Sequence, residues 1–260
     1  MEIKICGITR KKEIEYLVEA GVDYAGFVFF EKSKRNVSYE DATKLIALLP
    51  DSIRKVAVTV SPDEQSVRTL CGLGFDILQV HKELSPEAAA ASTIPIWYAV
   101  NISDEEELEH KLSIIHELGE LESRISAVVV DSANFGSGQV FNWRKSRRLL
   151  KAGAQSPPDE NVTSAESDAG KANVSAADVG KAALGEAALG EEPTDSGKTD
   201  FSKIFAGRQF VLAGGLSSEN VREGISFFNP DVVDVSSGVE GECGKDRDKI
   251  LAFVKAARAQ

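Results

Sequence analysis

The stretch EIKICGITRKKEIEYLVEAGVDYAGFVFF, residues 2–30, decides the fold because it contains one complete strand–helix–strand unit. Its two ends, 2–6 and 24–30, are short runs rich in β-branched and aromatic side chains, which is typical of buried strands. Between them, residues 10–20 repeat apolar side chains at the three- and four-residue spacing of a helix. Consecutive strands joined by a helix lie parallel, with a right-handed connection. The stretch therefore predicts a parallel α/β sheet.

The same alternation continues along the chain and predicts eight strands in all. Eight strand–helix units favour a closed (β/α)8 barrel, the TIM barrel, because open doubly wound sheets have about five to seven strands and a G-x-G-x-x-G segment after the first one. Here the first strand is followed by Gly7-Ile8-Thr9-Arg10, so an open α/β sheet is only the alternative. The further strands are expected at 55–60, 76–80, 95–100, 126–131, 209–213 and 232–236, and the further helices at 39–49, 63–72, 85–91, 103–119, 142–151, 217–227 and 246–258.

Length and composition fit a single barrel domain over residues 1–260. The chain is 42% hydrophobic and 27% charged, with a mean hydropathy of −0.15, which is typical of a soluble protein with a buried core. It has no run of about 20 apolar residues that would span a membrane. The opening segment MEIKICGITR lacks the apolar core of a secretory signal. We therefore expect a cytoplasmic protein without a membrane partner.

Charge and cysteine content exclude several kinds of partner. The 30 basic and 41 acidic residues give a net charge of −11, which repels the phosphate backbone of nucleic acids, so no nucleic-acid partner is expected. The cysteines Cys6, Cys71 and Cys243 are odd in number and lack the spacing of metal ligands. The sequence therefore predicts neither a disulfide framework nor a metal site.

One segment departs from the composition of the rest. Residues 151–200 contain eleven alanines, six glycines and no aromatic side chain, and the string AALGE at 182–186 is repeated at 187–191. Such a segment buries too little apolar surface to offset the entropy that is lost on ordering. We therefore predict that 152–204 is a low-complexity, disordered insertion between the sixth helix and the seventh strand of the barrel.

Reactive side chains stand at the predicted strand ends, where parallel barrels build their active sites. Cys6 ends the first strand and is either a catalytic group or a small buried hydrophobe. Asp131 closes the apolar run AVVVD, where a carboxylate is costly unless it faces the open mouth or a partner, so a catalytic acid or ligand anchor is favoured. Arg35 in the run KSKR is either a solvated charge or a clamp for a carboxylate.

Two late segments, LAGGLSSENV at 212–221 and VDVSSGVEG at 233–241, place small residues just after the last two strands. Backbone N–H groups can approach an anion at such positions, and barrel enzymes commonly bind phosphate between the loops after strands seven and eight. The two segments together therefore predict a phosphate site. Its expected residues are Gly214, Gly215, Ser236, Ser237 and Gly238.

Taken together, the segments at the strand ends resemble the phosphoribosylanthranilate isomerase family of tryptophan biosynthesis. The resemblance covers residues 1–150 and 208–258 and leaves out the low-complexity segment between them. Any one of these motifs is weak, but the set in this order is specific. The motifs are KICGIT at 4–9, GFVFFEKSKRNVS at 26–38, LQVH at 78–81, VVVDSANFGSGQVFNW at 128–143, LAGGLSSENV at 212–221 and VDVSSGVEGECGKD at 233–246.

The resemblance implies a (β/α)8 barrel that uses no metal or organic cofactor and acts on a small phosphosugar. The implied reaction is an Amadori rearrangement that converts N-(5′-phosphoribosyl)anthranilate to 1-(2-carboxyphenylamino)-1-deoxyribulose 5-phosphate. By their places in the motifs, Cys6 is the expected general base, Asp131 the general acid and Arg35 the clamp for the anthranilate carboxylate. The other expected substrate-binding residues, besides the phosphate loops, are Gln79, His81 and Asp234.

The implied chemistry gives each residue type a reason. Opening the sugar ring needs a proton on the ring oxygen, which Asp131 supplies if a partly desolvated setting raises its pKa from about 3.9. The resulting iminium acidifies the hydrogen on C2′, which a thiolate at Cys6 can remove. Helix N-termini and cationic neighbours at the strand end are expected to lower the pKa of this thiol from about 8.5. Holding the substrate by its phosphate and its carboxylate fixes the reacting centre between acid and base.

The sequence departs from the family pattern at four single positions and in the segment after Asp131, which reads Ser-Ala-Asn-Phe where the family more often has a richer glycine run. Glu31 and Lys34 replace common prolines, Thr59 replaces an aromatic residue, and Lys82 replaces a glycine. These changes bear on loop conformation and turnover but leave both proton-transfer residues in place. Two alternative functions stay open: a phosphosugar isomerase of histidine biosynthesis, alone or with dual specificity, which would have an aspartate in place of Cys6, and a non-catalytic phosphate-binding barrel. A monomer or a homodimer is expected.

Overall fold

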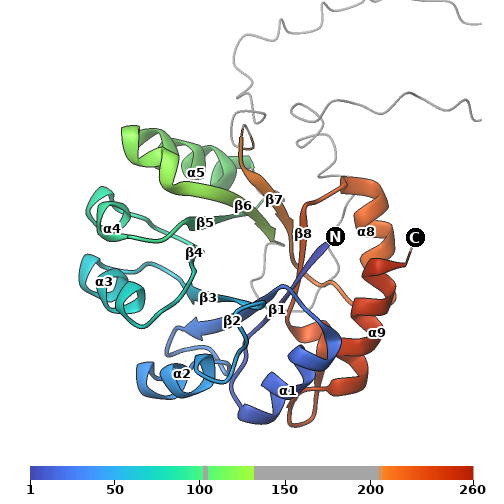
Figure 1. The fold of residues 1–260 in the computed structure, drawn as a ribbon. Coiled ribbons are helices and arrows are strands. Elements are labelled where there is room, and N and C mark those ends of the chain that lie inside the picture. The colour runs from blue at the N-terminus through green and yellow to red at the C-terminus, as the bar shows by residue number, and fades with distance from the viewer. Residues whose placement is uncertain (102–104, 132–204, 206, 260) are drawn as a thin grey trace, which may run out of the picture. The chain divides into compact units, whose positions relative to one another are not determined.

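The computed structural model describes residues 1–101, 105–131, 205 and 207–259. Its strands are β1 (Glu2–Cys6), β2 (Tyr24–Phe29), β3 (Arg54–Thr59), β4 (Ile77–Val80), β5 (Ile96–Asn101), β6 (Ile125–Asp131), β7 (Gln209–Leu212) and β8 (Val232–Val235). They pair in parallel in chain order to form a closed barrel (Figure 1). Closure comes from β1, which pairs with β2 on one side and with β8 on the other. The predicted (β/α)8 barrel is confirmed, and the open sheet is wrong.

Helices surround the strands (Figure 1). They are α1 (Lys11–Ala20), α2 (Tyr39–Ile46), α3 (Glu64–Gly72), α4 (Pro86–Ala91), α5 (Glu105–Glu117), α8 (Val221–Phe228) and α9 (Arg247–Arg258), with a 3-10 helix η1 (Gly119–Arg124) before β6. Helix α8 begins later than predicted because Ser217 and Asn220 form a turn, in which the Ser217 N–H donates to Asn220 Oδ1 over 2.8 Å. No described helix is long and apolar enough to cross a membrane. The predicted helix 142–151 and the predicted insertion 152–204 lie outside the described residues.

Helix starts follow from single side chains. Ser38, Asp63, Ser85 and Asp246 each precede a helix, and the side chain of each accepts a hydrogen bond from the backbone N–H three residues further on. These contacts satisfy donors that the first helical turn leaves without partners. Helix α1 ends at Gly21, whose φ of 63° is a left-handed conformation that glycine adopts without strain.

Apolar side chains pack in two layers. Inside the barrel, the layer includes Tyr24, Val58, Trp97 and Val211, and the ring centroids of Tyr24 and Trp97 lie 4.9 Å apart. A larger layer lies between the strands and the apolar faces of the helices. Two layers form because successive side chains of a strand point to opposite faces of the sheet. The interior is therefore filled by side chains, which leaves the strand ends for function.

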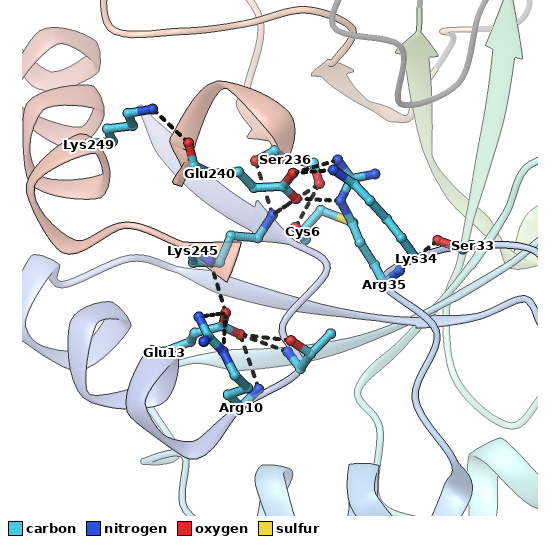
Figure 2. A network of polar contacts seen from close by, with 11 residues as sticks. Cys6, Arg10, Glu13, Ser33, Lys34, Arg35, Ser236, Glu240, Lys245 and Lys249 are labelled. Atoms are coloured by element: carbon cyan, nitrogen blue, oxygen red, sulfur yellow. Dashed lines mark hydrogen bonds and ion pairs between the residues drawn. The ribbon is translucent and has the colours of Figure 1, made fainter. Parts of the chain in front are cut away.

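A small hairpin that the sequence pattern did not predict follows β8. The 3-10 turn η2 (Ser237–Val239) leads into the antiparallel strands β9 (Glu240–Gly241) and β10 (Gly244–Lys245). Gly244 has a φ of 105°, and a Cβ at this position would lie 2.5 Å from Glu13 Oε1, so a side chain would be both strained and crowded. The hairpin brings Glu240 into contact with Arg35, which follows β2 (Figure 2).

Candidate active site

A cavity of about 530 Å³ lies at the carboxyl ends of the barrel strands. Each of the eight barrel strands except β5, or the loop that follows it, contributes to its lining. The fold therefore brings together residues that are far apart in the sequence, as predicted for a parallel barrel. The predicted site residues that line the cavity are Cys6, Arg35, Gln79, His81, Asp131, Gly214, Gly215, Asp234, Ser236 and Ser237.

Cys6 lies beside a buried ion pair. Lys4 and Cys6 are two residues apart on β1, so their side chains lie on the same face of the strand. The Lys4 Nζ donates to Asp234 Oδ2 over 2.6 Å, and both residues are buried. A Cβ on Gly26 of β2 would lie 3.0 Å from Cys6 Sγ and 3.2 Å from Lys4 Cε, so this glycine leaves room for both side chains. Sequence reasoning missed Lys4, although a lysine inside an apolar strand was an available signal.

The surroundings of Cys6 act on its thiol in two directions. Burial raises the pKa of Cys6 above its ordinary value, although the cations Lys4 and Lys245 act to lower it. The prediction of a lowered pKa for Cys6 is therefore wrong, because desolvation of the thiolate outweighs the nearby positive charge. Burial also opposes the charge on Lys4, but Asp234 and Cys6 together raise the pKa of this lysine, so it stays a cation.

Asp131 ends β6 and lines the same cavity as Cys6, and it is 8% exposed. Around the barrel the strands run β6, β7, β8 and then β1, so the carboxyl and thiol groups come from different walls. A ligand in the cavity can therefore contact both groups from two sides. Their roles as acid and base stay a prediction.

Gln79 lies on β4, and His81 is the first residue after that strand. Their Nε2 atoms lie 2.8 Å apart, so the Gln79 amide donates to an unprotonated ring nitrogen. Burial, with the cations Lys4 and Lys111, lowers the pKa of His81 to about 3. Among the described residues, Gln79 Oε1 and Asp234 Oδ1 are buried without a hydrogen-bond partner. These two oxygens are acceptors that a bound hydroxyl-bearing ligand can satisfy.

His81 is expected to make the free energy of unfolding depend on pH. It binds a proton only near pH 3 in the folded protein but near pH 6.5 once unfolded, so the unfolded state gains stability as the pH falls between these values. When the pH falls from 6.5 to 5, the free energy of unfolding of the native protein should decrease by up to about 2 kcal/mol more than that of His81→Asn. Urea unfolding at both pH values measures this, with the exposed His116→Asn as control. Equal losses in native protein and His81→Asn would contradict it.

Arg35 is held by a carboxylate and by the chain after β1. Its Nε and Nη2 donate to Oε1 and Oε2 of Glu240 over 2.5 and 3.1 Å (Figure 2). Its stem packs on Gly7, which has a φ of 84° and where a Cβ would overlap Arg35 Cδ. The Arg35 side chain is 13% exposed. The alternative of a solvated loop charge is therefore wrong.

The loops after β7 and β8 lie against each other at the predicted phosphate site. Gly214 and Gly215 have φ values of 83° and 66°, and among the described residues their backbone N–H groups have no acceptor. Gly238 was predicted to belong to the phosphate site, but it does not line the cavity. A Cβ on it would overlap the carbonyl oxygen of Leu216, so this glycine is required where the two loops touch. Free N–H groups on left-handed glycines are suited to an anion.

Two of the departures from the family pattern add positive charge to the site. Lys34 and Lys82 line the cavity together with Lys32. A local excess of cations attracts an anionic ligand even though the whole chain carries a net charge of −11. A third departure, Thr59, supports the β4 wall, because its hydroxyl donates to the carbonyl of Gln79 over 3.0 Å.

Comparison with known proteins gives one family. A family model described as N-(5′-phosphoribosyl)anthranilate (PRA) isomerase matches residues 3–162 and 196–256. The internal stretch that the model leaves unmatched, 163–195, falls within the predicted insertion. An N-(5′-phosphoribosyl)anthranilate isomerase from Thermoanaerobacter sp. (strain X514) is 31% identical over 264 residues, which cover 99% of this chain and 98% of the relative.

Two solved structures are similar over nearly their full length. The dimeric phosphoribosylanthranilate isomerase from Thermotoga maritima, solved as monomers, has a TM-score of 0.66 and 28% identity and covers 99% of this chain and 98% of its own. A phosphoribosylanthranilate isomerase in complex with reduced 1-(o-carboxyphenylamino)-1-deoxyribulose 5-phosphate has a TM-score of 0.66 and 27% identity, with 99% and 98% covered. The fold that these comparisons give is the barrel described above.

Proposed function

The chain belongs to the N-(5′-phosphoribosyl)anthranilate isomerase family and is an isomerase of tryptophan biosynthesis, and from this premise we propose that Cys6 is its general base and Asp131 its general acid. One observation carries the proposal: the thiol at the end of β1 and the carboxyl group at the end of β6 line one cavity. A cysteine in place of an aspartate at the end of β1 also favours this reaction over the isomerisation of histidine biosynthesis.

The cavity offers a partner for each charged end of the substrate. The 5′-phosphate fits the loops after β7 and β8, where the N–H groups of Gly214 and Gly215 are free among the described residues. The anthranilate carboxylate fits the guanidinium group of Arg35. A volume of about 530 Å³ lies within the usual range for a small-molecule site. Contacts at both ends would hold the ribose between Asp131 and Cys6.

The first step opens the ribose ring. Asp131 gives its proton to the ring oxygen while the bond from that oxygen to C1′ breaks, and the anthranilate nitrogen supplies the electron pair that forms the iminium. This step needs Asp131 as the protonated acid, and the residue is buried at the end of β6. Asp234 Oδ1 and Gln79 Oε1, which are buried without a partner among the described residues, would accept hydrogen bonds from the sugar hydroxyl groups.

The second step moves hydrogen between carbons. The iminium acidifies the C2′ hydrogen, Cys6 removes it as a thiolate, and the C2′–H electron pair forms the double bond of an enolamine. The enolamine then takes a proton at C1′ and releases the one on its C2′ hydroxyl, which leaves a ketone at C2′. C1′ is reduced and C2′ is oxidised within one molecule, so no external oxidant or reductant is needed.

Lys4 is proposed to favour the reactive thiolate form of Cys6. It stays charged beside the thiol, and its removal would also leave the Asp234 carboxylate uncompensated. In Lys4→Met we expect the pH midpoint for alkylation of Cys6 by iodoacetamide to rise by about one unit or more. Mass spectrometry of the peptide that contains Cys6 measures this over a pH series. Lys4→Gln serves as the second variant if methionine prevents folding.

The exposed Cys243 is the internal control for this experiment, because its alkylation is read in the same samples. Its midpoint is expected to be equal in the native protein and in Lys4→Met. A Cys6 midpoint that stays unchanged in a folded Lys4 variant would contradict the role given to Lys4.

Other parts of the proposal rest on the sequence. We keep the prediction of one domain over residues 1–260 that includes a low-complexity insertion at 152–204. We also keep the prediction that the protein works in the cytoplasm, without a metal or organic cofactor and without a nucleic-acid partner. The expected state is a monomer or a homodimer, and the relative from Thermotoga maritima is described as dimeric.

A further inference from the structure

Three cationic side chains meet at Glu240 on the hairpin after β8. Its carboxylate accepts hydrogen bonds from Arg35 on both oxygens, from Lys34 Nζ over 3.0 Å and from Lys245 Nζ over 2.9 Å (Figure 2). Burial alone would raise the pKa of Glu240, but the contacts with Arg35, Lys245 and Lys34 lower it to about 2. Glu240 is therefore an anion at neutral pH.

Glu240 occupies only one edge of the Arg35 guanidinium group, the edge formed by Nε and Nη2. A guanidinium group carries five N–H donors in one plane, so the edge formed by Nη1 and Nη2 can bind a second carboxylate. Among the described residues, Nη1 has no hydrogen-bond acceptor, and Arg35 lines the cavity. The arginine is thus fixed by one carboxylate and free to bind another.

Lys245 fixes Glu240 relative to the rest of the site. It is 4% exposed, and its Nζ also donates to the carbonyl and hydroxyl oxygens of Ser236 over 3.0 and 3.2 Å. The Ser236 hydroxyl in turn donates to the carbonyl of Cys6 over 2.9 Å. The Lys245 backbone N–H donates to the buried Glu13 of α1 over 2.9 Å. Arg35 is therefore linked through this chain of contacts to the strand that carries the thiol.

We propose that Glu240 is a positioning residue that sets which edge of Arg35 is offered to the ligand, and thereby selects substrates whose aryl amine carries a carboxylate. The inference rests on the proposed function, in which Arg35 binds that carboxylate. Without Glu240 the long side chain has more conformers, and binding must then order it at a cost in affinity. Lys34 and Lys245 offset the charge of Glu240, so the cluster stays positive toward an anion.

The test compares two ligands that differ only in the carboxylate. One is reduced 1-(o-carboxyphenylamino)-1-deoxyribulose 5-phosphate, and the other is its counterpart made from aniline. Isothermal titration with the full chain gives both dissociation constants. Glu240→Ala is expected to raise the Kd of the carboxylate ligand about tenfold and to change the Kd of the aniline ligand less than about twofold. If Glu240 had a merely structural role, Glu240→Ala would raise the Kd of both ligands by the same factor.

Three further variants sharpen the comparison. Glu242→Ala removes the same charge from an exposed position on the same hairpin and is expected to bind both ligands like the native protein. Glu240→Asp keeps the charge and is expected to restore part of the preference for the carboxylate ligand. When Glu240→Ala is added to Arg35→Met, the Kd of the carboxylate ligand should rise no further, because the guanidinium group that Glu240 positions is already absent.

The outcomes separate the two levels of the proposal. If Arg35→Met abolishes the preference for the carboxylate ligand and Glu240→Ala keeps it, the positioning role is wrong and the assignment of Arg35 stands. If the native protein binds both ligands equally, the assignment of Arg35 in the proposed function is itself wrong. Loss of preference in both Arg35→Met and Glu240→Ala, with Glu242→Ala unchanged, is the result we expect.

Discussion

Replacing Cys6 by alanine is expected to lower kcat for N-(5′-phosphoribosyl)anthranilate by about 10²- to 10⁴-fold, the contribution that general bases typically make. The thiol is the proposed acceptor of the C2′ hydrogen, and alanine removes that acceptor while leaving a small apolar side chain on β1. KM should change by less than about threefold, because the phosphate and carboxylate contacts remain. The loss of substrate fluorescence in a stopped or continuous assay measures both constants.

The other cysteines supply matched controls for this experiment. Cys71 is on α3 and Cys243 is exposed on the hairpin, and neither lines the cavity. Cys71→Ala and Cys243→Ala are therefore expected to turn over substrate at the native rate. A kcat for Cys6→Ala within threefold of native would contradict the assignment of the general base.

Replacing Asp131 by asparagine is expected to lower kcat by a similar factor, about 10²- to 10⁴-fold. Asparagine has nearly the same shape but has no acidic proton to give to the ring oxygen, so ring opening should become the slow step. The same fluorescence assay measures the change. Asp51→Asn is the control, since Asp51 is exposed and does not line the cavity. Native turnover in a folded Asp131→Asn variant would remove Asp131 from the proposed mechanism.

The barrel could be predicted from the sequence because its signals are local. In the first unit, strand 2–6 and helix 10–20 differ in the spacing of their apolar residues, and the observed β1 and α1 agree with them to within a residue. The capping residues Ser38 and Asp246 also act over only three positions. Elements of this kind are decided by neighbours in the chain, which the sequence displays directly.

The location of the residues at the strand ends could be predicted from the sequence, but their pKa shifts and packing contacts could be predicted only in part. Cys6 and Asp131 line the cavity as expected, because a parallel barrel brings all its strand ends to one side. The direction of the pKa shift of Cys6 was wrong, since it depends on how far burial outweighs the charge of Lys4. Gly238 was placed with the phosphate loops, but its role is to let one loop pack on Leu216.

The parts of the site that sequence reasoning missed depend on contacts between distant residues. The ion pair of Lys4 with Asp234 joins positions 230 residues apart, and that of Arg35 with Glu240 joins positions 205 apart. No spacing rule connects such pairs, because the closure of the barrel between β8 and β1 creates the contact. Glu240 in particular belongs to a hairpin that has no strand-like run in the sequence.

The measurement that tests the central claim most directly is turnover of freshly generated N-(5′-phosphoribosyl)anthranilate by the purified full chain, followed by the loss of its fluorescence and by identification of the product. We predict many turnovers per protein molecule, with conversion to 1-(2-carboxyphenylamino)-1-deoxyribulose 5-phosphate. Absence of turnover in a sample shown by circular dichroism to be folded would contradict the account.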